Sequence, residues 1–256
     1  MLKDQSSITA IVNKYSRVIL LSAEDAQDRL WHLCVRQSKA ASKVLEAESD
    51  TAPMSGRWPM TKQHYLMGTM YLLSRYLCWV EILKEEVSLL EFNDDAKTTL
   101  FNYHLKRVER TLSETNLQKL KHKPSKIAEV PQSKRNTIST DKPVFQLMQA
   151  EIGYGLRESV EDGSRCISFP QFKSNYDALK ADSDAFEQLE KLVFGSMSDA
   201  KSNFCLTRLK LFANALMDLV LFLQEHNEIK QSETLEKIPI KDFDLDGYLK
   251  DWPITP

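Results

Sequence analysis

A long run of apolar residues at gaps of three and four constrains the fold of this chain most strongly. The run extends over residues 66–90, so its members share one stripe of a single helix about 40 Å long. A second stripe of this kind covers residues 8–44. Because continuous apolar stripes need to be covered, we expect the two helices to pack on each other or on partners. The first stripe comprises Leu66, Met70, Leu73, Leu77, Val80, Leu83, Val87 and Leu90, and the second Ile8, Val12, Tyr15, Ile19, Ala23, Ala26, Leu30, Leu33, Ala40 and Val44.

Residues that form tight turns are scarce. The 256 residues include only 7 glycines and 9 prolines, which argues against a β-sandwich with its many turns. The sequence therefore predicts an all-α fold, an antiparallel bundle of long helices with shorter helices packed on one end. At this length the chain can bury a substantial core.

The N-terminal half is expected to be a bundle of three long helices within residues 1–120. Prolines and a glycine predict a loop over 50–59, between a first helix ending near Glu48 and a second spanning about 61–92. Asn93, Asp94 and Asp95 would end that helix and begin the third. The buried face of the third helix is predicted to hold Phe101, Leu105, Val108 and Leu112.

The C-terminal half is expected to pack on this bundle through residues 143–226. A helix over about 144–159 would be broken at 161–163, before a short extended stretch. Ser168 and Gln171 have the spacing of a capping box that opens another helix. The remaining predicted helices cover about 184–194 and 199–226.

Two charged segments flank this second group of helices. Residues 119–142 hold seven Lys or Arg against two acids, and we predict a basic flexible linker over 121–142. Residues 225–256 hold eight acids against four lysines, within a predicted acidic tail over 227–256. The linker lacks interleaved aromatic residues, and the whole chain has a net charge of −2, so no specific nucleic-acid partner is expected.

Cysteine spacing and hydropathy favour a cytoplasmic protein. The four cysteines lie far apart without a CxxC pair, which is typical of reduced, mostly buried thiols: Cys34, Cys78, Cys166 and Cys205. No uncharged apolar run approaches the roughly 20 residues of a membrane span. Weak peripheral membrane contact through residues 8–21 stays open as an alternative.

Motifs for metal, cofactor or nucleotide binding are not evident, so we predict neither a metal nor a cofactor. The five histidines lack HxxxH or ExxH spacing, which weakens a di-iron interpretation. The sequence Gly153-Tyr154-Gly155 lies within a helical pattern, so close helix packing is favoured over a phosphate loop.

Four charged residues stand out as candidates for a ligand site or for buried ion pairs. Arg75 lies near several aromatic residues and would need a partner if buried, for which Glu151 and Asp218 are the candidates. Asp218 lies in a very apolar segment but shares a polar stripe with Thr207, Asn214 and Glu225, so a solvated or interface-facing stripe is favoured. Glu81 lies on a similar stripe, and the same interpretation applies.

Segments 15–33, 65–92, 144–158, 165–172 and 206–224 together resemble a group of uncharacterised bacterial helical proteins. Members often have an aromatic-Val-Glu step like Trp79-Val80-Glu81, and a Gly-Glu-Gln step where this chain has Gln149-Ala150-Glu151. Many members carry a membrane-anchoring helix ahead of the region that matches Tyr15, and this chain lacks a full one. The resemblance implies a helical fold and a bacterial origin, and it points to no particular activity.

Our leading functional hypothesis is an interaction or scaffold protein without enzymatic activity, which binds a protein partner or self-associates. One alternative is a small-ligand or nucleotide-responsive enzyme whose site is assembled from Arg75, Glu81, Glu151 and Asp218. The other is a peripheral membrane protein.

Overall fold

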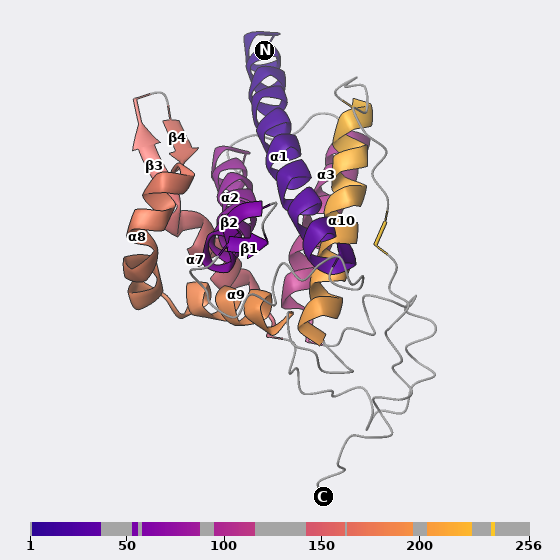
Figure 1. Cartoon of the computed structure of the whole chain (residues 1–256). Coiled ribbons are helices and arrows are strands. Elements are labelled where there is room, and N and C mark those ends of the chain that lie inside the picture. The colour runs from indigo at the N-terminus through magenta and orange to yellow at the C-terminus, as the bar shows by residue number, and fades with distance from the viewer. Residues whose placement is uncertain are drawn as a thin grey trace, which may run out of the picture.

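A computed structural model describes residues 2–36, 53–55, 58–87, 95–115, 142–161, 163–196, 204–226 and 237–238. The described part contains seven helices and two short hairpins, and the helices alone hold more than half of the 256 residues (Figure 1). The predicted all-α fold is therefore confirmed. The helices are α1 (Leu2–Arg36), α2 (Lys62–Val87), α3 (Asp95–Ser113), α7 (Gln146–Gly155), α8 (Phe169–Asp182), α9 (Asp184–Gly195) and α10 (Phe204–His226); the strands are β1 (Pro53–Ser55), β2 (Trp58–Thr61), β3 (Arg157–Val160) and β4 (Gly163–Cys166).

The four longest helices form the bundle. α1 packs between α2 and α10, and α3 covers another side of α10. Packed neighbours run antiparallel, as the chain direction in Figure 1 shows. α2 also packs on α7 and α8, which lie on the far side of α2 from α1, and α9 packs on α2, α7 and α10. α9 crosses the lower end of the bundle in this view.

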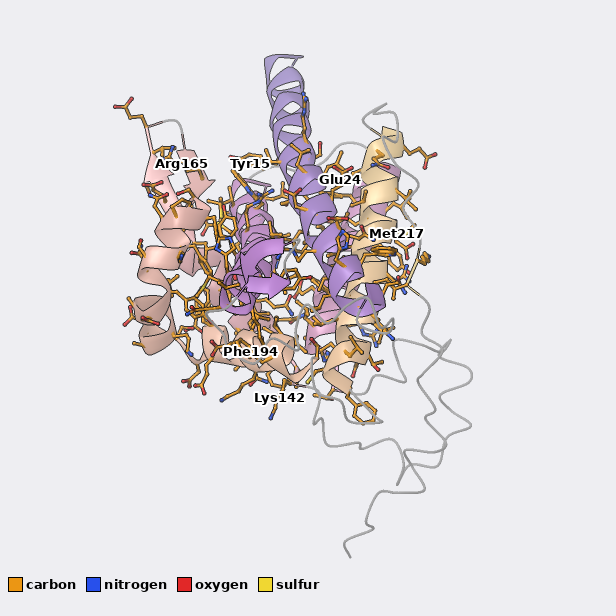
Figure 2. All side chains as sticks on the ribbon, viewed as in Figure 1. Tyr15, Glu24, Lys142, Arg165, Phe194 and Met217 are labelled. Carbon is orange, nitrogen blue, oxygen red and sulfur yellow. The ribbon has the colours of Figure 1, made fainter. Side chains whose placement is uncertain are left out.

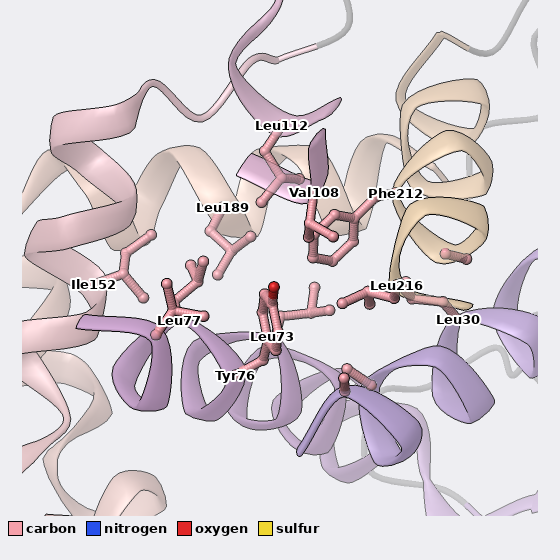
Figure 3. Close-up of a cluster of buried hydrophobic side chains, with 14 of the residues drawn as sticks. Leu30, Leu73, Tyr76, Leu77, Val108, Leu112, Ile152, Leu189, Phe212 and Leu216 are labelled. Carbon is pink, nitrogen blue, oxygen red and sulfur yellow. The ribbon is translucent and has the colours of Figure 1, made fainter. Parts of the chain in front are cut away.

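The predicted apolar stripes form the core. Every member of the first stripe from Leu66 to Leu83 is at most 7% exposed, and so is every member of the second from Tyr15 to Leu33. The predicted face of α3 is buried as well. Side chains from six helices meet in one cluster (Figure 3), which joins the predicted 1–120 and 143–226 segments through a common core: Leu30, Leu73, Tyr76, Leu77, Val108, Leu112, Ile152, Leu189, Phe212 and Leu216.

Gly153 allows α7 to approach α2 closely, as predicted. A Cβ added there would lie 2.7 Å from Cγ of Glu81 and 2.9 Å from the carbonyl oxygen of Leu77, both on α2. Any larger residue would push the two helices apart.

The helix predicted over 144–159 is too long at both ends. α7 stops at Gly155, and residues 157–160 form β3, which pairs antiparallel with β4. Glycine is a poor helix former, and Gly163 supplies the positive φ of 125° in the turn. The break at 161–163 was thus predicted, but the strand before it was not.

Other local predictions had mixed outcomes. The capping box is confirmed, because Ser168 and Gln171 cap each other at the start of α8. The predicted helix over 184–194 is α9. The loop predicted over 50–59 contains most of the β1–β2 hairpin, a regular element that short, proline-containing strands do not signal.

Several predictions fall outside the described residues. These concern the first helix beyond residue 36, residues 121–141 of the basic linker, the start of the last helix, and all of the acidic tail except residues 237–238. No described helix has an apolar stretch that could cross a membrane. Within the segment 8–21 proposed for membrane contact, Ile19 and Leu20 are buried in the protein core.

Candidate functional site

Arg75 pairs with α1. Its Nη2 atom donates to Oδ2 of Asp25 at 2.6 Å, so the predicted pairing with Glu151 or Asp218 is wrong. The antiparallel packing of α1 and α2 places Asp25 beside Arg75, a long-range neighbour that helical spacing alone does not identify. The two side chains are 24% and 53% exposed, so the pair lies near the surface rather than in the core.

The other α2 and α7 candidates are separate from Arg75. Glu81 is buried at 9% exposure beside Gly153 of α7 and accepts from Nζ of Lys84 at 2.7 Å. Glu151 is exposed on α7. Among the described residues, none of the four sequence candidates forms an ion pair with another. A ligand site shared by these four residues therefore stays a prediction.

Asp218 connects three parts of the chain. Its two carboxylate oxygens lie 2.7 Å from Nη1 of Arg107 on α3 and 2.7 Å from Nζ of Lys237. The Asp218 side chain is 14% exposed, so most of its surface is covered. Two cations around one mostly buried carboxylate offset the cost of removing that charge from water.

Asn214 lies one helical turn before Asp218 and binds the backbone of Ile238, the residue after Lys237. Its Nδ2 atom donates to the carbonyl oxygen of Ile238 at 3.0 Å, and its Oδ1 atom accepts from the amide of Ile238 at 2.7 Å. An amide side chain that donates to and accepts from one residue in this way makes the two backbone hydrogen bonds that a neighbouring β-strand would make. Of the polar stripe predicted on this helix, Asn214 and Asp218 thus both contact residues 237–238.

The local sequence favours this docking. Asn214 and Asp218 share a face of α10, since residues four apart are neighbours on a helix. Ile238 precedes Pro239, which disfavours helical backbone and favours the extended form that exposes both backbone groups. The Ile238 side chain is 2% exposed and belongs to the hydrophobic core.

We call Arg107, Asn214 and Asp218 the tail-docking site. Lys237 and Ile238, the docked pair, lie beside α10 as a short yellow segment in Figure 1. Figure 2 labels Met217, the neighbour of Asp218, at the same level of α10. The site contains a backbone-binding amide, a carboxylate for a lysine and a buried position for an aliphatic side chain.

Sequence reasoning missed Lys237, Arg107 and Arg208. The available signal for the docking of Lys237 and Ile238 was their position before Pro239, within a polar tail. Arg208 is completely buried, and its guanidinium donates to the backbone oxygens of Thr111, Leu112 and Glu114 at 2.6–2.8 Å. It therefore caps the C-terminal end of α3, where carbonyl groups lack helical partners.

The described residues contain no group of three or more His, Cys, Asp or Glu side chains placed to hold a metal ion. Comparison of this chain with protein-family models, with curated proteins and with solved structures finds no match.

Proposed function

We propose that this chain is a helical interaction protein whose tail-docking site binds an extended peptide segment of a protein partner. The observation that carries the proposal is the pair of hydrogen bonds between Asn214 and the backbone of Ile238. In the unbound protein the chain's own tail occupies the site. A partner segment would replace it.

The chemistry of the site defines the segment it would select. The Asn214 amide reads backbone groups, so it accepts an extended residue of any type. Asp218 favours a lysine or arginine at the preceding position, because its carboxylate already faces the Lys237 ammonium group. The burial of Ile238 favours a medium-sized aliphatic side chain.

A binding titration with full-length protein tests this proposal. A fluorescently labelled peptide with the sequence of residues 232–244 is titrated with wild type and with a Lys237→Glu/Ile238→Ser double variant, and anisotropy is measured. The double variant should bind more tightly, because its own tail no longer occupies the site.

Adding Asn214→Ala to the double variant should weaken binding by about 30-fold, since two neutral hydrogen bonds of about 1 kcal/mol each are lost. Asn102→Ala, at an exposed position of α3, is the matched control and should leave binding unchanged. Equal, undetectable binding by all variants would refute the proposal.

Self-association is a related prediction, because a second copy carries the same Lys237–Ile238 pair. Exchange of tails between two copies would produce a dimer that depends on Asn214. Sedimentation equilibrium of wild type and Asn214→Ala measures this directly: a dimer lost in the variant supports exchange, and a monomer in both excludes it.

A further inference from the structure

The β3–β4 hairpin is attached to one face of α2 at two points. Near one end, the hydroxyl of Tyr71 donates to the carbonyl oxygen of Ile167 at 3.0 Å. Near the other end, Glu85 forms an ion pair with Arg157 and accepts from the Tyr154 hydroxyl. Both hydrogen bonds lower the pKa of the Glu85 carboxyl, and the bond from Tyr154 has the larger effect.

These two attachments place Cys166 opposite Cys78. Tyr71, Cys78 and Glu85 are spaced by seven residues, which puts them on the same face of α2. Cys166 directly precedes Ile167, and it is the cross-strand partner of Arg157. Cys166 thus lies between the residue that Tyr71 binds and the residue that Glu85 binds. This places it opposite Cys78, at the middle of the row.

Cys78 and Cys166 face each other where α2 packs on β4, between these two attachments. A hydrogen bond with Cys166 is the first cause that raises the pKa of the Cys78 thiol, and burial is the second. Both cysteines are free in the structure. Cys78 is fully buried, whereas Cys166 is partly exposed, so a reagent in solution reaches Cys166 first.

We infer that Cys78 and Cys166 form a reversible disulfide in response to hydroperoxides, and that this bond fixes the β3–β4 hairpin to α2. In the first step the Cys166 sulfur attacks a peroxide oxygen. With hydrogen peroxide, the S–O bond forms as the O–O bond breaks, the departing hydroxide takes the Cys166 proton and leaves as water, and Cys166 becomes a sulfenic acid.

In the second step the Cys78 sulfur attacks the sulfur of the Cys166 sulfenic acid. The S–S bond forms, the S–O bond breaks, and the departing hydroxide takes the Cys78 proton as water. Two thiols lose two electrons in total, and one hydrogen peroxide becomes two waters. An external dithiol reverses the reaction.

Peptide mapping of the full chain after treatment with hydrogen peroxide tests this inference. Trypsin should release residues 76–84 and 166–173 as one linked pair, 2 Da lighter than the separate peptides together, and dithiothreitol should separate them. The oxidised protein should also melt about 10 °C higher than the reduced protein, because the bond closes a long loop in the unfolded chain.

Cys166→Ser should lose both the linked pair and the shift in Tm. A Cys34→Ala/Cys205→Ala variant is the matched control, because it removes the two other buried thiols and should keep both effects. If a variant fails to fold, the peptide map of the peroxide-treated wild-type protein alone shows whether the disulfide forms. Peroxide treatment that gives Cys166 sulfinic acid, an intermolecular Cys166 dimer or an unchanged Tm would overturn the inference.

Discussion

Removal of the Arg208 side chain should destabilise this protein more than almost any other single truncation. The guanidinium is at 0% exposure and donates 2.7, 2.8 and 2.6 Å hydrogen bonds to the carbonyl oxygens of Thr111, Leu112 and Glu114. The Leu112 oxygen also accepts from the amide of Val144 at 2.9 Å, so it keeps one partner in a variant. The other two oxygens lose a charge-assisted bond.

Each buried carbonyl that loses its donor costs about 1–3 kcal/mol, and hydrogen bonds to charged groups are worth about 1.5–3 kcal/mol. We therefore expect Arg208→Ala to lower the free energy of unfolding by about 3–5 kcal/mol, against a total of about 5–15 kcal/mol. Arg208→Lys should recover only part of this loss, because an ammonium group lacks the planar fork that reaches several carbonyls.

Urea denaturation followed by circular dichroism measures these changes as shifts in midpoint at constant slope. Arg110→Ala is the matched control. Arg110 also lies near the end of α3, but its side chain is 56% exposed and it pairs with Glu114, four residues further along the chain. It should cost no more than about 0.5 kcal/mol. A similar, small effect of Arg208→Ala and Arg110→Ala would refute the capping argument.

Three other outcomes follow from the same structure. Arg75→Ala should cost about 0.2–1 kcal/mol in thermal melts, because its partner Asp25 is 53% exposed; a loss above 3 kcal/mol would contradict a surface pair. Gly153→Ala should cost about 1–3 kcal/mol in the same assay. Gly68→Ala should be neutral or stabilising, because the added Cβ would lie 3.4 Å from Nη1 at the flexible end of the Arg29 side chain. Since its native pKa is lowered, Glu85 stabilises the fold above its unfolded pKa, and this contribution is lost as pH falls through the folded pKa. Glu85→Gln should therefore flatten the acid side of the stability profile, and an unchanged profile would exclude the effect.

The helices could be predicted from the sequence because their signal is local. Spacings of three and four residues in residues 66–83 and 15–33 correspond to buried positions with few errors. The capping box at Ser168 was also readable, since its two partners are three residues apart. The β3–β4 hairpin was less predictable, because its strands are only four residues long and lie next to a helical pattern.

The polar contacts could not be predicted, because they depend on which helices become neighbours. The sequence offered Glu151 and Asp218 as partners for Arg75, but the packing of α1 on α2 selects Asp25. Asn214 and Asp218 were recognised as one stripe, but their partners lie on α3 and in the tail. Arg208 gave no signal, since a buried arginine and an exposed one have the same spacing on a helix.

Hydrogen exchange at the Ile238 amide tests the tail-docking site most directly. This amide donates to Oδ1 of Asn214 and belongs to a residue that is 2% exposed. By NMR, its exchange in the wild-type protein should be at least about 30-fold slower than in a free peptide of residues 232–244, as two hydrogen bonds require. Asn214→Ala should abolish most of this protection, and Asn102→Ala should not change it. Wild-type exchange at the rate of the free peptide would contradict the docking of Lys237–Ile238 on α10, and with it the proposed function.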